Sequence, residues 1–241
     1  MNLFEEHKAE RRTRILAAAR ELIAERGYDG LTMRDLAQAS RVSVPTLYNL
    51  FGGKQALLLG ELESTFAAVV AGIVTARDGN VVDRALATCE AGNADLLAVP
   101  RYSRELILLF LTSAETADLR RTSAEQYAEL MAEILRDGQK AGEIESWVDP
   151  LVLSRRMFAH YQLAMIEWAR GELDADAFRS ATRFGMCVML LGVARGTVRR
   201  RLTTELRTVQ ATMTSGGRAM PSDRRSMRSR GRSKARPRKG E

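Results

Sequence analysis

Residues 31–54 constrain the fold of this sequence more than any other stretch, because they carry the signals for two short helices joined by a tight turn. Thr32 is a good N-cap for a first helix that begins at about Met33. Asp35 follows three residues on, where its carboxylate faces the positive end of the helix in a variant of the capping box. Residues 39–42 interrupt the helical periodicity and predict the end of this helix.

A second helix is expected to begin at about Val44. Ser43 can cap it, and Pro45 is tolerated in its first turn because the N–H groups there have no acceptor within the helix. Apolar residues of the two helices recur at spacings of three and four, which lets the pair share one seam made of Met33, Leu36, Ala37, Leu47 and Phe51. The residues left facing outward are Thr46, Tyr48 and Asn49. A helix-turn-helix of this kind suits insertion of its second helix into a DNA major groove.

The motif is made of Leu31-Thr32, Arg34, Leu36-Ala37-Gln38, Val42, Pro45-Thr46-Leu47-Tyr48 and Lys54. In this combination it resembles the DNA-binding domain of the tetracycline-repressor (TetR/AcrR) family, within roughly the first 60 residues. The resemblance implies an all-α protein, with an N-terminal three-helix helix-turn-helix DNA-binding domain and a larger helical domain that binds an effector and dimerises. Most members of that family are repressors.

The resemblance also assigns DNA contacts. The candidates for contact with base edges are Arg34, Val44, Pro45, Thr46 and Asn49, and the candidates for contact with phosphates are Thr32, Tyr48 and Lys54. Arg34 can form a bidentate contact with guanine, whereas Lys54 acts as a point charge on the backbone. Leu50 stands where the family often has His or Tyr, so a contact from that position is lost. A helical hairpin that merely faces solvent is the alternative interpretation of the same pattern.

The charge of the chain is unevenly distributed. The formal net charge is +7, but residues 213–241 hold ten Lys or Arg residues against Asp223 and Glu241, a charge of +8, which leaves −1 for residues 1–212. Residues 211–241 are expected to form a basic, disordered tail. Such a tail either attracts phosphates in a manner that weakens with salt, or is a dispensable solvated extension. Other basic residues that can approach phosphates are Lys8, Arg11, Arg12 and Arg14.

The rest of the chain has helical periodicity without strand-like alternation. Predicted helices cover residues 12–26, 54–76, 81–98, 103–113, 123–140, 149–171 and 174–209. The helix over residues 54–76 is expected to be a rod between two domains, whose movement can transmit a signal. We therefore predict a DNA-binding domain over residues 1–53, a helical ligand-binding and dimerisation domain over residues 54–210, and the tail over residues 211–241.

The last two helical segments are predicted to form a dimer interface. They make a hairpin broken at residues 171–174, and its second arm is too apolar around its circumference for a lone surface helix. Its apolar residues are Met186, Val188, Met189, Leu191 and Val193, and the glycines that permit close helix approach are Gly185, Gly192 and Gly196. In the family that it resembles, the equivalent helices of two subunits form a four-helix interface, which implies a homodimer and a pseudo-palindromic operator. Alternatively, these side chains complete the core of a monomer.

The resemblance further places a ligand among the middle helices. Apolar and aromatic surface with a few polar groups suits a small lipophilic effector. The candidates are Phe110, Tyr127, Met131, Leu135, Met157, His160, Tyr161, Met165 and Trp168. Each of them taken alone is more typical of a protein core than of a ligand contact. Because the chain holds only His7 and His160, a metal-chelated tetracycline is not expected as the ligand.

Other classes of protein are disfavoured. The sequence lacks a phosphate-binding glycine loop, the CxxC or HxxxH spacing of a metal site and a recognisable catalytic triad, so we expect no enzyme, no cofactor and no metal. The longest apolar stretches are about half of the roughly 20 residues that a membrane span requires, and no signal-peptide pattern opens the chain. Cys89 and Cys187 are isolated, which indicates a reducing cytoplasm.

Together these observations predict a cytoplasmic homodimeric repressor that binds a double-stranded DNA operator and is released by a small, largely apolar molecule. One alternative is a DNA-binding protein without a small-molecule effector, which acts constitutively or through a protein partner. Another is a helical interaction protein that has lost DNA binding, although the presence of Tyr48 and Lys54 argues against it.

Overall fold

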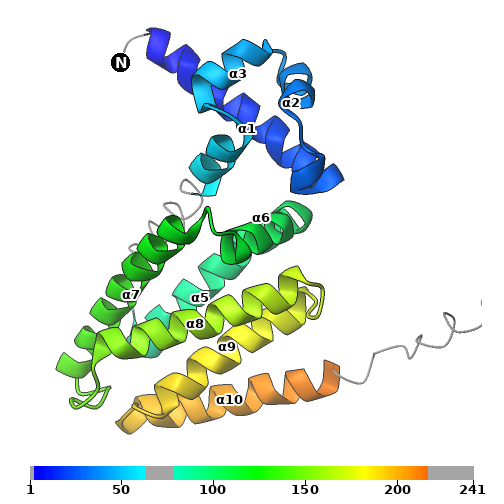
Figure 1. The fold of residues 1–241 in the computed structure, drawn as a ribbon. Coiled ribbons are helices and arrows are strands. Elements are labelled where there is room, and N and C mark those ends of the chain that lie inside the picture. The colour runs from blue at the N-terminus through cyan, green and yellow to red at the C-terminus, as the bar shows by residue number, and fades with distance from the viewer. Residues whose placement is uncertain (1–2, 63–78, 217–241) are drawn as a thin grey trace, which may run out of the picture.

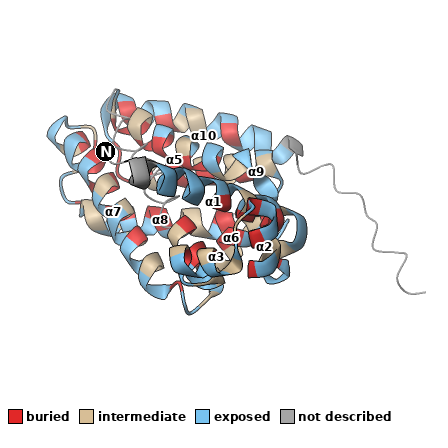
Figure 2. Cartoon of the chain, turned by 90° about the horizontal axis from the view of Figure 1, so that it is seen from above, coloured by how far each residue is buried: buried red, intermediate tan, exposed pale blue. Residues whose placement is uncertain are grey.

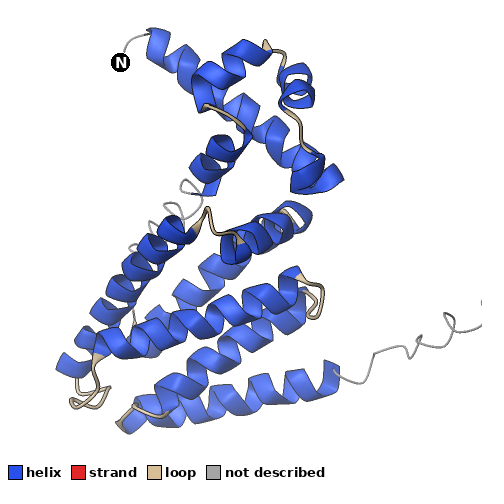
Figure 3. Ribbon diagram, in the orientation of Figure 1, coloured by secondary structure: helices blue, strands red, loops and turns tan. Residues whose placement is uncertain are grey.

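The computed structural model describes residues 3–62 and 79–216, and the regular elements in these ranges are helices (Figure 1). They are α1 (Leu3–Gly30), α2 (Met33–Ser40), α3 (Val44–Phe51), α5 (Val81–Ala98), α6 (Pro100–Thr112), α7 (Ala117–Lys140), α8 (Pro150–Ala169), α9 (Ala175–Leu191) and α10 (Gly196–Gly216). Residues 54–62 are helical as well. The predicted all-α fold is therefore confirmed, as Figure 3 shows.

α1 is longer than the predicted helix over residues 12–26, because it begins at Leu3 and ends at Gly30. Apolar residues do not recur at helical spacing in the sequence of residues 3–11, so periodicity does not reveal these turns, although their Glu, Lys, Arg and Ala residues favour a helix. Gly27, at which the sequence predicted a helix end, has φ 72° and ψ 169° and breaks the helix inside α1. A short last turn follows this break.

The prediction of one helix over residues 174–209 is wrong, because the chain reverses after Leu191. α9 ends there, and α10 begins at Gly196, whose φ of 54° favours glycine. Two backbone hydrogen bonds with residues 143–145 hold the reversal in place. Gly192 and Gly196, interpreted from the sequence as points of close helix approach, instead flank this turn.

The helices of the C-terminal domain pack in chain order, with α7 on α8, α8 on α9 and α9 on α10, while α5 lies against both α7 and α9. Their buried side chains form one main core, in which the fully enclosed residues include Val82, Met131, Leu135, Cys187 and Leu202. Figure 2 shows the alternation of buried and exposed residues along these helices, as amphipathic helices around a shared core require.

A second core joins the N-terminal helices to α6. It contains Ile15 of α1, Leu36 of α2, Leu47 of α3, Leu57 of the helix over residues 54–62, and Phe110 of α6. α6 is therefore packed into the N-terminal domain, although it follows that domain by some 50 residues in the chain. The boundary predicted at residues 53 and 54 does not separate two independent cores.

Several predictions concern the edges of the described ranges. The predicted rod is helical over residues 54–62, and its remainder lies outside the described residues. The predicted disordered tail is helical from residue 211 as far as Gly216, and the rest of it lies outside the described residues. In the part of the chain that the structure describes, we find no helix with the length and apolar character needed to cross a membrane.

Candidate nucleic-acid interface

The start of α2 has the predicted cap. Thr32 has an extended backbone (φ −114°, ψ 152°), and its hydroxyl oxygen accepts a hydrogen bond from the Asp35 N–H at 3.1 Å. The same hydroxyl donates to the Asp35 carboxylate at 2.8 Å, and Arg26 of α1 lies 3.5 Å from that carboxylate. These contacts satisfy an N–H group that has no acceptor within the helix, and they link α2 to α1.

The turn between α2 and α3 lies where the sequence predicted a break in helical periodicity, and Ser43 provides the predicted cap. Arg41 adopts the left-handed conformation, and the Val42 N–H donates back to the Ala37 carbonyl at 3.0 Å. Ser43 then caps α3, because its hydroxyl oxygen accepts a hydrogen bond from the Thr46 N–H at 3.2 Å. Local side-chain hydrogen bonds therefore fix both helix starts of the helix-turn-helix.

Arg41 is the described non-glycine residue with a positive φ, at 54°. An L-residue in this region is disfavoured by roughly 1 kcal/mol or more relative to glycine, which is the preferred residue after a helix end. We therefore expect Arg41→Gly to raise the midpoint of thermal unfolding by about 2–4 °C, measured by circular dichroism. Arg41→Ala removes the same charge but keeps the backbone strain. Equal stabilisation by both variants would assign the effect to the charge and contradict the strain argument.

α2 and α3 share the predicted apolar seam. Leu36 and Leu47 are fully buried, and Met33, Ala37 and Phe51 are each at most 9% exposed in the same core. Because side chains of α1 back this seam, the outer face of α3 stands on a packed support rather than on a loop.

Most of the predicted DNA contacts lie on the outer surface of these helices. The exposed ones are Thr32, Arg34, Pro45, Tyr48 and Asn49, and the partly buried ones are Val44, Thr46 and Lys54. Pro45, Tyr48 and Asn49 are spaced by three and four residues, so they share one face of α3. The structure thus brings three of the predicted contacts together on a single exposed helix face.

Lys54, which is predicted to act as a point charge on the DNA backbone, also has contacts within the protein. Its ammonium group lies 4.2 Å from the centroid of the Tyr28 ring, and it donates a hydrogen bond to the Asp29 carbonyl at 3.5 Å. These contacts tie the start of the helix over residues 54–62 to the end of α1. Loss of Lys54 therefore changes packing as well as charge.

Arg12, one of the basic residues expected near phosphates, contacts the end of α3. Its guanidinium group lies 4.5 Å from the centroid of the Phe51 ring and donates to the Leu50 carbonyl at 3.3 Å. A positive charge at the C-terminal end of a helix favours that helix through its dipole. Arg12 thereby supports α3 from behind.

Sequence reasoning missed an ion pair in the core behind these helices. Arg20 of α1 donates two hydrogen bonds to the Glu61 carboxylate, at 2.7 and 3.1 Å, and the Glu61 side chain is 1% exposed. The pKa of Tyr102 on α6 is raised, first by burial and then by the negative charge of Glu61. The available signal was Glu61 itself, which lies between Leu58 and Leu62 in an apolar stripe, but nothing local identifies its partner.

The family model described as "Bacterial regulatory proteins, tetR family" matches residues 15–60. The matched range begins in α1, contains the capped α2–α3 pair and ends in the helix over residues 54–62. This chain is a member of the TetR family of transcriptional regulators. It therefore binds DNA and regulates transcription, as the motif around α3 predicted.

Similar proteins agree with this assignment. The TetR-family chain is 29% identical over 177 residues to the HTH-type transcriptional repressor KstR2 of Rhodococcus jostii (strain RHA1), a match that covers 70% of this chain and 85% of the relative. Among solved structures it is similar to the fatty acid degradation regulator FadR of Bacillus halodurans, with a TM-score of 0.65 at 18% identity over 75% of this chain and 94% of that one. A similar match is FadR of Bacillus subtilis in complex with stearoyl-CoA, with a TM-score of 0.62 at 16% identity over 74% and 97%. The two structural matches establish the fold alone.

The predicted effector contacts of this TetR-family chain lie in different clusters of the structure. The main core contains Met131, Leu135 and Met157, with Tyr127 packed against it, whereas Met165 and Trp168 lie in a smaller cluster with Phe178. Tyr161 packs against both clusters, and Phe110 lies in the core of the DNA-binding domain. Phe110 is thus separated from the other candidates, which adjoin one another through Tyr161.

His160 is partly buried and already has a partner. Its Nε2 atom lies 3.3 Å from the Ala181 carbonyl oxygen on α9. Gly185 makes room for the imidazole ring, because a Cβ atom at that position would coincide with it. This histidine therefore helps α8 and α9 to pack closely.

A group of buried polar side chains joins α5, α8 and α9, and of its members the sequence singled out Tyr161 alone. The Tyr161 hydroxyl donates to the Asn93 side-chain oxygen at 3.1 Å, and the Asn93 side-chain nitrogen donates to the Thr182 hydroxyl at 2.9 Å. Asn93 and Thr182 are 1% and 2% exposed, and burial raises the pKa of Tyr161. Gly92 permits the arrangement, since a Cβ there would lie 2.7 Å from the Tyr161 hydroxyl.

Proposed function

We propose that this TetR-family regulator is a homodimeric repressor that binds a pseudo-palindromic operator and leaves it when a small, largely apolar effector binds the C-terminal domain. The observation that carries the DNA-binding part is the exposed face of α3, formed by Pro45, Tyr48 and Asn49 on a packed support. A short capped helix with this combination of side chains fits the major groove and its phosphate edges.

The surface of α8 and α9 supports the dimer. Val152 and Leu163 of α8 and Val188 of α9 are 57%, 53% and 45% exposed, and large apolar side chains on two adjacent helices favour burial by a partner. Met186 and Val193, which the sequence analysis also assigned to the interface, are 2% and 9% exposed within the single chain, so they belong to its own core. We propose that α8 and α9 of two chains form a four-helix interface related by a two-fold axis.

This interface predicts the effect of introducing charges. Leu163→Glu combined with Val188→Glu is expected to convert the dimer to a monomer at micromolar concentration, because a two-fold interface would bury two copies of each carboxylate. Sedimentation equilibrium measures the mass directly. Val99→Glu is the matched control, since Val99 is 46% exposed but lies between α5 and α6. A dimer that survives the double change would place the interface elsewhere.

The composition of the C-terminal domain supports a lipophilic effector. The helices there hold clusters of apolar side chains with the polar group Tyr161, Asn93 and Thr182 among them, and such a mixture is typical of ligand sites. The Bacillus subtilis FadR structure, which has a similar fold, contains stearoyl-CoA. We therefore propose a ligand with an apolar chain and at least one hydrogen-bonding group.

α6 provides a physical connection between such a ligand and the DNA-binding domain. Ile107 of α6 packs in the cluster of Trp168 and Phe178, whereas Leu106 and Phe110 pack in the core behind α2 and α3. A ligand that displaces α8 therefore moves a helix that the DNA-binding domain also uses. A 100-fold loss of operator occupancy requires about 2.7 kcal/mol of ligand preference for the released conformation.

A second candidate function is a constitutive DNA-binding protein, without a small-molecule effector. The observation that favours it is the tight packing of the predicted ligand contacts, of which Met131, Met157 and Trp168 are fully buried. In this case the polar group of Tyr161, Asn93 and Thr182 fixes the relative positions of α5, α8 and α9, since its members already satisfy one another.

One experiment tests both candidates. The purified chain is used to select from random duplex DNA at near-physiological salt, and the retained duplexes are sequenced. Recovery of an inverted repeat supports the repressor proposal, and recovery of no motif contradicts it. The selected duplex is then titrated with stearoyl-CoA and with free fatty acids of several chain lengths. Release by a saturable ligand supports the effector, whereas a complex that none of these compounds disturbs favours the constitutive function.

A further inference from the structure

α10 is attached to the C-terminal domain through one face. Val198, Leu202 and Val209 on this face are at most 6% exposed, and Val198 and Leu202 belong to the main core. The remaining faces of α10 are mostly exposed along the described part of the helix. α10 is thus a fixed helix with a broad free surface.

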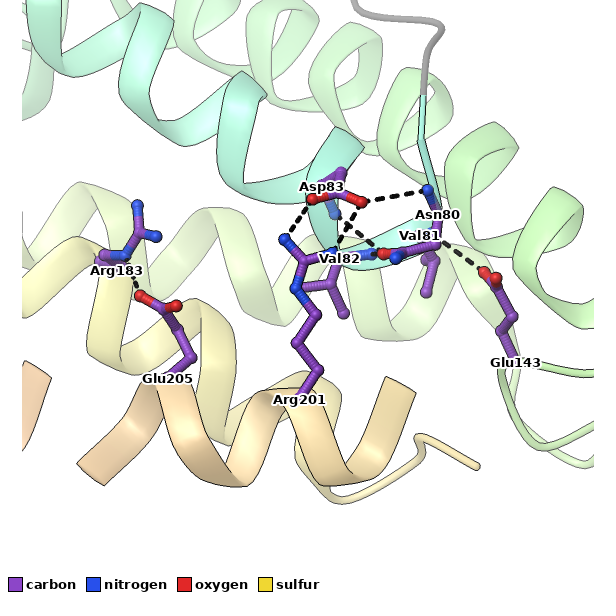
Figure 4. A network of polar contacts seen from close by, with 8 residues as sticks. All are labelled: Asn80, Val81, Val82, Asp83, Glu143, Arg183, Arg201 and Glu205. Carbon is purple, nitrogen blue, oxygen red and sulfur yellow. Dashed lines mark hydrogen bonds and ion pairs between the residues drawn. The ribbon is translucent and has the colours of Figure 1, made fainter. Parts of the chain in front are cut away.

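Two ion pairs hold the inner face of α10 in register (Figure 4). Arg201 forms a bidentate pair with Asp83 at the start of α5, and the Arg201 hydrogen bonds hold the pKa of Asp83 below its ordinary value. Glu205, one turn further on, pairs with Arg183 of α9 at 2.6 Å. Glu205 is the sole acidic residue in the sequence of α10, so the negative charge of this helix is neutralised on its inner side.

The outer face of α10 is basic. Arg200, Thr204, Arg207 and Thr208 are exposed and follow one another at helical spacing. Among the described residues, neither Arg200 nor Arg207 has an ion-pair partner, in contrast to Arg201. The two arginines lie seven residues apart, which places them on one side of the helix and roughly 10 Å apart along its axis.

The hydroxyl groups on this face leave the arginines accessible. The Thr204 hydroxyl donates to the Arg200 carbonyl at 3.3 Å, and the Thr208 hydroxyl donates to the Thr204 carbonyl at 3.2 Å. These donors are therefore satisfied within the helix. The outer face, defined by Arg200, Thr204, Arg207 and Thr208, consists of two unpaired guanidinium groups separated by short side chains.

The position of this outer face distinguishes it from the surface of α3. Figure 1 shows α10 at the opposite end of the molecule from α2 and α3. The sequence that follows α10 has charge of the same sign, with ten Lys or Arg residues against two acidic ones over residues 213–241. An anionic partner attracted here cannot be the same short stretch of DNA that α3 contacts.

We propose that the outer face of α10 is a second DNA-binding surface, which binds the phosphate backbone of a duplex without reading its sequence. Guanidinium groups are well suited to pair with phosphates, and the face carries no carboxylate to oppose them. α10 has no aromatic residue on which unpaired bases could stack, and the face has no large apolar side chain for insertion into a membrane. One protein can in this way hold two separate duplex segments.

A capture assay tests the second surface directly. A random 60-base-pair duplex is fixed to beads, the full-length protein is bound to it, and a fluorescent random duplex is then added. We expect the wild-type chain to retain the fluorescent duplex, and Arg200→Gln combined with Arg207→Gln to reduce its capture at least fivefold. The slope of log affinity against log salt for the free duplex is expected to fall by about 2 per protomer, since two phosphate contacts are lost.

Matched variants separate a local surface from an effect of total charge. Arg121→Gln combined with Arg136→Gln removes the same charge from α7, where each arginine faces an acidic residue of its own helix, and is expected to preserve capture. Arg200→Lys combined with Arg207→Lys keeps the charge, and this variant is expected to retain most of the capture of the second duplex. Equal capture by the Arg200/Arg207 glutamine variant and the wild type would overturn the proposal, as would equal loss in the α7 control.

Vesicles of anionic lipid provide a further test of the partner. Binding of the wild-type chain to vesicles of phosphatidylcholine and phosphatidylserine, with no capture of a second duplex, would overturn the choice of DNA as the partner. The assay uses random duplexes on both sides, so it does not depend on the existence of an operator. Failure of the operator selection and failure of duplex capture are therefore separate results.

Discussion

Replacement of Arg20 by alanine is expected to lower the free energy of unfolding by about 3 kcal/mol, because it leaves the buried Glu61 carboxylate without this counter-charge. Glu61 is 1% exposed and accepts two hydrogen bonds from Arg20. The Arg20 side chain is 47% exposed, so water screens part of the interaction, and the expected loss lies at the lower end of the range for buried pairs. Urea denaturation monitored by circular dichroism measures the difference in free energy of unfolding between this variant and the wild type.

Two comparisons identify the source of this effect. Arg26→Ala removes a surface ion pair with Asp35, in which both side chains are more than one-third exposed, and is expected to cost less than about 0.5 kcal/mol. Arg20→Met combined with Glu61→Leu removes both charges and is expected to recover most of the stability, since no carboxylate stays buried. Similar small losses for Arg20→Ala and Arg26→Ala would show that the buried pair contributes little.

The elements that the sequence predicted well are those with a local cause. Thr32 and Ser43 each bond to an N–H three residues away, so the helix starts at Met33 and Val44 can be inferred from a few neighbouring residues. The apolar seam follows in the same way from spacings of three and four. The family resemblance rests on this stretch, which is why the domain that contacts DNA was the best-predicted part.

The features that escaped prediction depend on contacts between distant residues. Arg20 and Glu61 are 41 residues apart, and Arg201 and Asp83 are 118 residues apart. Periodicity identifies the buried face of a helix but not the helix that covers it, so neither pair could be assigned. The reversal after Leu191 was missed for the same reason, because its stabilising hydrogen bonds come from residues 143–145.

The effector candidates show a further limit of sequence reasoning. Apolar side chains such as Phe110 and Trp168 have the same helical spacing whether they fill a core or line a ligand site. In the structure Phe110 packs behind α2 and α3, whereas Trp168 stacks on Phe178, so residues with one sequence signature occupy separate clusters. The buried polar group at Asn93 had no sequence signature, since an isolated Asn in a helix is common on surfaces.

The largest effect on DNA binding is expected from Arg34→Ala. Arg34 is exposed on α2, and the family resemblance assigns it to a base edge. A bidentate arginine–guanine contact discriminates by about 1–3 kcal/mol, and a homodimer would lose two of them. We therefore expect affinity for the selected operator to fall at least about 30-fold, while affinity for random duplex changes little. Fluorescence anisotropy with both duplexes measures the two affinities.

The contrast with Tyr48 decides whether Arg34 reads sequence. Tyr48→Phe removes one hydroxyl that the resemblance assigns to a phosphate. We therefore expect it to lower the affinity for the operator and the affinity for random duplex by the same factor. Tyr48 is a cleaner probe than Lys54, because Lys54 also packs on Tyr28. A repeated selection with the Arg34→Ala protein should recover a motif relaxed at one position of each half-site. If instead the motif is unchanged and the affinities for both duplexes fall equally, Arg34 contacts phosphate and the specificity of this regulator comes from α3 alone.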